Sequence, residues 1–139
     1  MRVVLDTNCL IASLSRRSPY YNVWSSLQTG EYVLCVSNEI LEEYEEIISF
    51  KTNSLIASNV IQTIINCVNV EFVDPHFCFH LVKDDEDDNK FADCAIVANA
   101  TFIVSNDKHF KSIEKSDFPS VEVKSVQEFS AMLKSKGLG

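Results

Sequence analysis

Two aspartates in this chain each follow a short apolar run that is typical of a buried strand. Val-Val-Leu leads directly into Asp6, and Phe-Ile-Val leads into a polar turn that ends with Asp107. Residues 84–88 lie between them and form a run of five acids. In parallel α/β sheets, ligands bind beyond the carboxyl ends of the strands. We therefore predict that the two aspartates share one acidic site.

Several carboxylates at one edge of a sheet repel one another, and they stay ionised together only when cations offset the repulsion. Their hard oxygen atoms favour Mg²⁺ or Mn²⁺ over zinc. An ion held in this way can orient a phosphodiester and lower the pKa of a bound water. The alternative for any single acid is an ordinary solvated residue, and residues 84–88 also suit a solvated loop that precedes a helix.

The pattern of the chain predicts the elements that would position these acids. Strands are expected at residues 2–5, 32–36, 70–73, 102–104 and 121–123. Helical patterns alternate with them, and four of the helices are expected to begin at Asn8, at Ser37, at Asn53 or Ser54, and at the Ser125-x-x-Glu128 capping box. This alternation indicates an α/β fold with a central parallel sheet of four or five strands.

The 139 residues are most simply one domain, with residues 134–139 expected to fray at its end. No stretch is long and apolar enough to span a membrane, and the amino-terminal segment, with an acid at residue 6, does not resemble a signal peptide. The five cysteines form an odd set without a CxxC pair. We expect free thiols and a location in the reducing cytoplasm.

The formal net charge of −8 bears on the substrate, because proteins that bind nucleic acids are generally basic. Either the substrate is not a polyanion, or bound cations and a local basic patch reverse the field at the site. The cations that flank the proposed site in sequence, and could contact phosphates, are Arg16, Arg17, Lys90, Lys108 and Lys111. Scattered solvated cations are an equal alternative for each of them.

Four segments together resemble a known family. They are Val-Val-Leu-Asp6-Thr7-Asn8, Ser37-x-x-Ile40-Leu41-x-Glu43, Asp85-x-x-Asp88-Asn89-x-Phe91-x-Asp93-x-Ala95 and Ile103-Val104-Ser105-Asn106-Asp107. In this order they look like a PIN domain, and in particular like the VapC-like toxin components of toxin–antitoxin systems. The resemblance runs from residue 2 to about residue 130.

The resemblance implies a three-layer α/β/α domain and a metal-dependent ribonuclease that hydrolyses RNA. The four acids that match the family's catalytic and metal-binding positions are Asp6, Glu43, Asp88 and Asp107. They would hold one or two Mg²⁺ or Mn²⁺ ions. The family likeness also suggests a homodimer and a small antitoxin that blocks the site.

Four other positions follow from the same resemblance. Asn8 and Ser105 match polar residues that orient the first acid or the metals, and Asp93 is placed as a supporting ligand. Asn106 stands where such families usually have glycine, and we expect it to take the left-handed conformation that glycine would take.

Two rival functions are open at this point. A phosphatase that uses Asp6 as its nucleophile would usually have a second aspartate two residues later, where this chain has Asn8. A non-catalytic module would keep the fold and bind a metal or a partner without cutting RNA.

Overall fold

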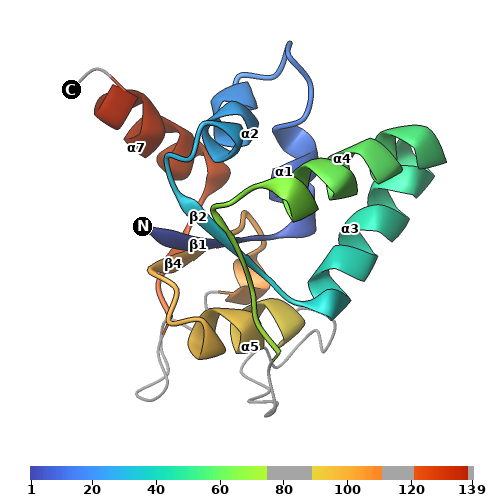
Figure 1. Ribbon diagram of the computed structural model, residues 1–139. Helices are drawn as coiled ribbons and strands as arrows, with labels where there is room; N and C mark the ends of the chain where they lie inside the picture. The colour runs from blue at the N-terminus through green and yellow to red at the C-terminus, as the bar shows by residue number, and fades with distance from the viewer. Residues whose placement is uncertain (75–88, 111–120, 138–139) are drawn as a thin grey trace.

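The computed structural model describes residues 1–74, 89–110 and 121–137 (Figure 1). Its strands are β1 (Arg2–Leu5), β2 (Val33–Val36), β3 (Val70–Phe72), β4 (Phe102–Val104) and β5 (Val123–Lys124). Its helices are α1 (Thr7–Ala12), α2 (Tyr21–Gln28), α3 (Asn38–Lys51), α4 (Ser54–Asn66), α5 (Asn89–Val97), the 3₁₀ turn η2 (Lys108–Phe110) and α7 (Val126–Gly137). Fraying from Lys134 onward, within α7, stays a prediction.

The described strands form one sheet in the order β3-β2-β1-β4-β5, and every pair is parallel. The predicted parallel α/β sheet is therefore confirmed, although β5 begins two residues later than expected. The strand β1 lies at the centre beside β4, with Leu5 opposite Val104. This register brings the residues that follow the two strands to the same edge.

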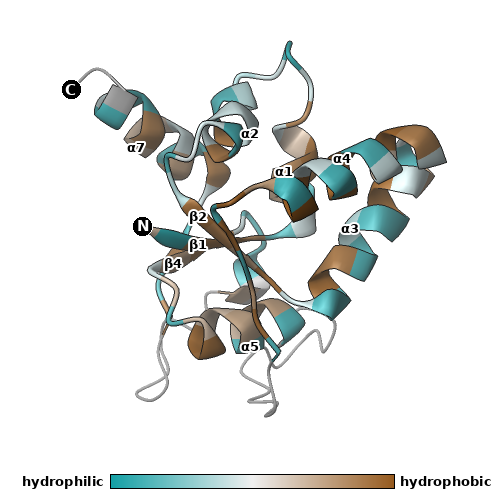
Figure 2. Cartoon of the chain, viewed as in Figure 1, coloured by the Kyte–Doolittle hydropathy of each residue, from teal (hydrophilic) through white to brown (hydrophobic). Residues whose placement is uncertain are grey.

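Helices cover both faces of the sheet, as the continuous apolar strands predict. In Figure 1, α5 lies on one side of the sheet, while α2 and α7 pack together on the other. Figure 2 shows the apolar residues concentrated along the central strands. The ring of Phe129 in α7 meets Tyr32 and Phe102 edge-on, at centroid distances of 5.0 and 5.5 Å. The three-layer arrangement is thus built around one aromatic and aliphatic core.

Three of the four predicted helix starts are confirmed by their hydrogen bonds. The Ser37 hydroxyl accepts from the Ile40 N–H at 3.3 Å, and the Asn53 side chain accepts from the Ile56 N–H at 2.9 Å. Ser125 and Glu128 each bind the other's N–H at 3.0 Å, which is a complete capping box.

The fourth predicted helix start is wrong. Asp6, not Asn8, occupies the N-cap position of α1, because Asp6 keeps the extended backbone of β1 (φ −61°, ψ 146°) and the helix begins at Thr7. Asn8 lies inside the first turn with an exposed side chain. The strand therefore changes into the helix directly at the candidate catalytic aspartate.

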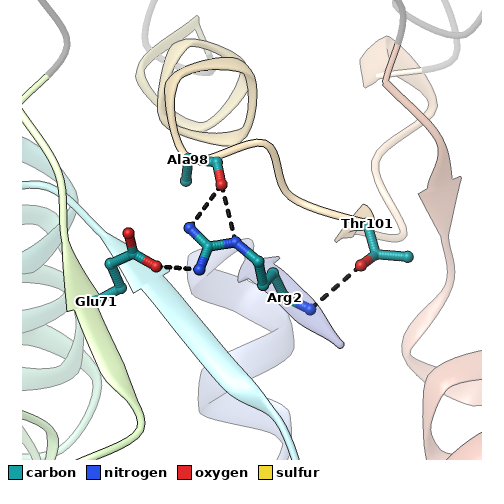
Figure 3. A network of polar contacts seen from close by, with 4 residues as sticks. All are labelled: Arg2, Glu71, Ala98 and Thr101. Atoms are coloured by element: carbon teal, nitrogen blue, oxygen red, sulfur yellow. Dashed lines mark hydrogen bonds and ion pairs between the residues drawn. The ribbon is translucent and has the colours of Figure 1, made fainter.

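A polar network closes the amino end of the sheet (Figure 3). The guanidinium of Arg2 donates two hydrogen bonds to the Ala98 carbonyl, at 2.9 and 2.6 Å, and forms an ion pair with Glu71. The Arg2 N–H donates to the Thr101 hydroxyl at 3.2 Å, and the Thr101 N–H donates back to the Arg2 carbonyl at 2.7 Å. The network therefore ties the end of α5 to β1 and β3.

Four cysteines lie in the described part of the chain, and all four are free thiols: Cys9, Cys35, Cys67 and Cys94. This agrees with the expectation from their odd number; Cys78 lies outside the described residues. Within the ranges given above, no helix has the length and apolar character needed to cross a membrane.

Candidate active site

The two strand-end aspartates meet at the carboxyl edge of the sheet through a serine. The Asp6 N–H donates to the Val104 carbonyl at 3.0 Å, which continues the pairing of β1 with β4 by one residue. The Ser105 hydroxyl donates to Asp6 Oδ2 at 2.9 Å and accepts from the Asp107 N–H at 3.0 Å. Ser105 thereby orients the first acid and also shapes the turn that presents the second.

The environment of Asp6 disfavours its charge. Asp6 is only 8 % exposed, and this burial is the main cause that raises its pKa above the usual value. The hydrogen bond from Ser105 acts in the opposite direction, while the negative charges of Glu43 and Asp107 raise the pKa further. Two carboxylates from distant parts of the chain are thus close enough to affect the charge of Asp6.

Glu43 is held in place by residues from two other helices. Thr7, at the start of α1, donates its hydroxyl to Glu43 Oε2. The ammonium group of Lys90, in the first turn of α5, forms an ion pair with Glu43 Oε1 at 2.8 Å. The neighbouring Tyr44 donates to the Leu5 carbonyl at 2.5 Å, which fastens α3 to the end of β1. Glu43 is therefore fixed where α1, α3 and α5 converge.

A hollow of about 280 Å³ opens beside the two strand-end aspartates. It is lined by Asp6, Asn8, Cys9, Ala12, Asn106, Asp107 and Val126. The helix α1 supplies one wall, and the turn after β4 and the start of α7 supply the other. The two acids therefore border a space that a small group could enter.

Cys9 lines the hollow, whereas the sequence analysis expected of the cysteines only that they are free thiols. Burial raises its pKa to about 12, with a further contribution from the charge of Asp6, so the thiol is protonated at neutral pH. Its position three residues after Asp6, at the start of a helix, was the available signal, because one helical turn returns the chain to the same side.

Asn106 differs from the expected conformation. Among the described non-glycine residues, the positive φ belongs to Asn99 (53°), so the predicted left-handed turn at Asn106 is wrong. Its side chain instead accepts a hydrogen bond from the Val126 N–H at 2.9 Å, at the start of α7. An amide side chain thus joins the site loop to the last helix, which glycine could not do.

The remaining predicted residues lie in different surroundings. Asp93 is buried in α5 and is 5 % exposed. Asn8 is exposed, and its side-chain oxygen accepts from Lys51 Nζ at 3.4 Å. The candidate phosphate contacts Arg16, Arg17 and Lys108 are exposed, and their role stays a prediction. Asp88 and Lys111 lie outside the described residues.

The donor set fits a hard divalent ion in its chemistry. Asp6, Asp107 and Glu43 offer carboxylate oxygens. Burial is the main cause of the raised pKa of Asp6, and the charges of Glu43 and Asp107 add to it; a cation would relieve that repulsion. Within the described ranges, no three His, Cys, Asp or Glu side chains gather closely enough to hold one ion together. The fourth acid of the predicted set, Asp88, belongs to the part that is not described.

Comparison with known families agrees with this geometry. A family model described as a PIN domain matches residues 2–109. The chain therefore belongs to the PIN domain family, as the order of its motifs predicted. Comparison with curated proteins gave no match.

Solved structures with the same fold include two VapBC complexes. One is VapBC2 from Rickettsia felis bound to a DNA fragment from their promoter, with a TM-score of 0.62 and 19 % identity over 90 % of this chain and 98 % of the other. Another is VapBC-1 from nontypeable Haemophilus influenzae, with a TM-score of 0.61 and 19 % identity over 91 % and 99 %. The predicted three-layer PIN fold is thereby confirmed, together with its likeness to VapC structures.

Proposed function

We propose that this PIN domain is a Mg²⁺- or Mn²⁺-dependent endoribonuclease and the toxin of a toxin–antitoxin pair. The observation that supports this most directly is the Asp6–Ser105–Asp107 arrangement. It joins two acids at the ends of adjacent parallel strands, with the charge of Glu43 close enough to raise the pKa of Asp6. A buried carboxylate whose pKa is raised by burial and by specific charged neighbours, as that of Asp6 is, marks a candidate functional site.

In this proposal Asp6, Glu43, Asp88 and Asp107 hold the metal. When bound, the ion supplies charge neutralisation at the scissile phosphate and activation of a water. The chain's own contribution is orientation, since Ser105 fixes Asp6 through Oδ2 and Thr7 fixes Glu43 through Oε2. The hollow beside Asp6 and Asp107 would receive the phosphodiester.

The acidic balance of the chain makes local cations important for an RNA substrate. Arg16, Arg17 and Lys108 are exposed and flank the site in sequence, and we propose them as phosphate contacts. Lys51 joins this set, because it reaches Asn8 at the border of the hollow. Their contribution would appear as a dependence of RNA affinity on salt concentration.

We also propose a small antitoxin as a protein partner, a homodimeric state and a cytoplasmic location. The structural likeness to two toxin–antitoxin complexes supports the antitoxin. The four free thiols are in keeping with a reducing compartment.

A non-catalytic metal- or partner-binding module is the alternative that one observation favours. Glu43, one of the four proposed ligands, already pairs with Lys90 and Thr7. A site whose ligands are engaged in this way could keep the fold without cutting RNA.

The experiment that tests the nuclease is cleavage of a mixture of structured and single-stranded RNAs with Mn²⁺ or Mg²⁺, with and without a chelator. We expect Asp6→Asn and Asp107→Asn to reduce cleavage by more than about a thousandfold, because each removes a metal-binding charge. Asp74→Asn is the matched control, since Asp74 is an exposed aspartate that follows β3, and it should cut within about twofold of wild type.

Two results would contradict the nuclease. One is cleavage that survives both the chelator and Asp6→Asn. The other is a folded wild type that binds Mn²⁺ but leaves every RNA intact, which would support the non-catalytic module instead.

A further inference from the structure

We propose that Lys90 is a built-in counter-ion of the acidic site, whose ammonium group competes with a divalent ion for Glu43 and thereby lowers the metal affinity of the site. The inference rests on the proposed function in one respect, namely that the acids bind a metal. Lys90 is then a positioning residue that acts through Glu43.

The first observation is that the ion pair between Lys90 and Glu43 is short and little exposed. Lys90 Nζ lies 2.8 Å from Glu43 Oε1, and the two side chains are 14 % and 26 % exposed. A pair with this little exposure is screened less by solvent and salt than a surface pair. The contact therefore matters for the charge of the site.

The second observation is that Lys90 is held on more than one side. Its ammonium group lies 5.4 Å from the centroid of the buried Phe91 ring, within the range of a cation–π contact. It also belongs to α5, whose far end is tied down by Arg2. Lys51, by comparison, is exposed and reaches the neutral Asn8 at 3.4 Å. Lys90 is thus the better placed of the two to act as a fixed positive charge.

The third observation is that both oxygens of Glu43 have donors. Oε1 pairs with Lys90, and Oε2 accepts from the Thr7 hydroxyl. A metal that uses Glu43 must take an oxygen that one of these groups now contacts. The ammonium group is also a cation, so it repels the incoming ion as well as occupying its ligand. Removal of the lysine charge should strengthen metal binding.

The test is the affinity for Mn²⁺, measured by calorimetry in the absence of RNA. We expect Lys90→Met, which keeps the aliphatic stem, to bind Mn²⁺ about tenfold more tightly than wild type, because it removes one positive charge beside a ligand. Lys134→Met is the matched control, since Lys134 is exposed in α7 and its loss changes the net charge by the same amount. Its affinity should stay within about twofold of wild type.

A double-mutant cycle separates this role from a general structural one. Glu43→Gln should weaken Mn²⁺ binding, and adding Lys90→Met to Glu43→Gln should change the affinity by less than about twofold. A lysine that only supported the fold would change the affinity similarly in both backgrounds. Circular dichroism and thermal unfolding with a chelator would establish that each variant is folded, with Lys90→Gln as a second variant if Lys90→Met is not.

The outcomes distinguish this inference from the proposed nuclease. If Asp6→Asn abolishes Mn²⁺ binding but Lys90→Met binds no more tightly than wild type, the counter-ion role is wrong and the metal site stands. The same holds if Glu43→Gln leaves Mn²⁺ affinity unchanged. If folded wild-type protein binds neither Mn²⁺ nor Mg²⁺, both proposals fail.

Discussion

The charged side chains at the two ends of β1 have opposite kinds of neighbour. At the amino end, Arg2 has an opposite charge, Glu71, and a helix-end carbonyl, Ala98, as partners. At the carboxyl end, Asp6 is buried, and its neighbours Glu43 and Asp107 carry the same charge as its own. One strand of four residues thus links an end where a charge is paired with its opposite to an end where the charge of a buried acid is disfavoured.

The pKa values express the same difference. Glu71 raises the pKa of Arg2, which means that its charged form is favoured. Burial and like charges raise the pKa of Asp6, which means that its charged form is disfavoured. Proteins tolerate such a cost where function requires it, and a stabilising substitution at such a position usually reduces activity. The contrast therefore supports the proposal that the functional site lies at the carboxyl end of β1.

The contrast predicts a large loss of stability at the amino end. Arg2→Met should lower the free energy of unfolding by about 2 kcal/mol, because it removes two charge-assisted hydrogen bonds to Ala98. The ion pair with Glu71 should add little, since the Arg2 and Glu71 side chains are 35 % and 40 % exposed. Urea denaturation would measure the change, with the exposed Arg16→Met as control. If Arg2→Met and Arg16→Met lowered the free energy of unfolding equally, the amino end of β1 would not be a stabilising site.

At the carboxyl end of β1, removal of the charge should increase the free energy of unfolding instead of lowering it. In metal-free protein at neutral pH, Asp6→Asn should raise the free energy of unfolding by about 1 kcal/mol, because it removes a buried charge that like charges surround. Denaturation with a chelator would measure it. Added Mn²⁺ should stabilise wild type and leave Asp6→Asn unchanged. If Asp6→Asn were less stable than wild type, the charge of Asp6 would not be destabilising the folded protein.

The pH dependence sharpens the same prediction. The folded pKa of Asp6 is raised, so the unfolded chain ionises first as the pH increases past its ordinary value of 3.8. Wild type therefore loses stability through Asp6 between that value and the raised folded pKa, and the loss is constant above it. The advantage of Asp6→Asn should vanish well below the ordinary pKa of 3.8 and grow to its full size by neutral pH. Denaturation curves across this range would test it, and an advantage that is equal at all pH values would contradict the assigned cause.

The smallest expected effect concerns the loop between the two acids. Asn106→Ala should lower the free energy of unfolding by about 0.5–1 kcal/mol through loss of the hydrogen bond from Val126. Asn106→Gly should be destabilised at least as much, because glycine also lacks the side-chain acceptor and is more flexible when unfolded. A Gly variant that is more stable than wild type would favour the left-handed turn after all.

Much of the fold was predictable from local pattern. The apolar runs before Asp6 and Asp107 and the alternation with helical segments were sufficient for a parallel α/β sheet with both aspartates at one edge. Ser37 and the Ser125–Glu128 pair were recognisable because a helix cap depends on residues three positions apart.

Two predictions, the helix cap at Asn8 and the left-handed turn at Asn106, were wrong because of contacts between distant parts of the chain. Asn8 was a reasonable cap by residue type, but the strand pairing of Asp6 with Val104 places the N-cap two residues earlier, at Asp6. Asn106 was predicted from the tolerance of asparagine for a left-handed backbone. Its side chain instead accepts a hydrogen bond from a residue 20 positions away. In both cases a tertiary contact overrode a propensity.

The sequence by itself therefore determined which residues end the central strands, because period and residue type are properties of neighbouring positions. Only the tertiary structure decided how their charges are balanced. The hydrogen bond from Thr7 to Glu43 spans 36 residues, and the bonds from Arg2 to Ala98 span 96. Such partners meet only when helices have packed on the sheet, since the pairing of side chains far apart in the chain depends on packing geometry and not on local pattern.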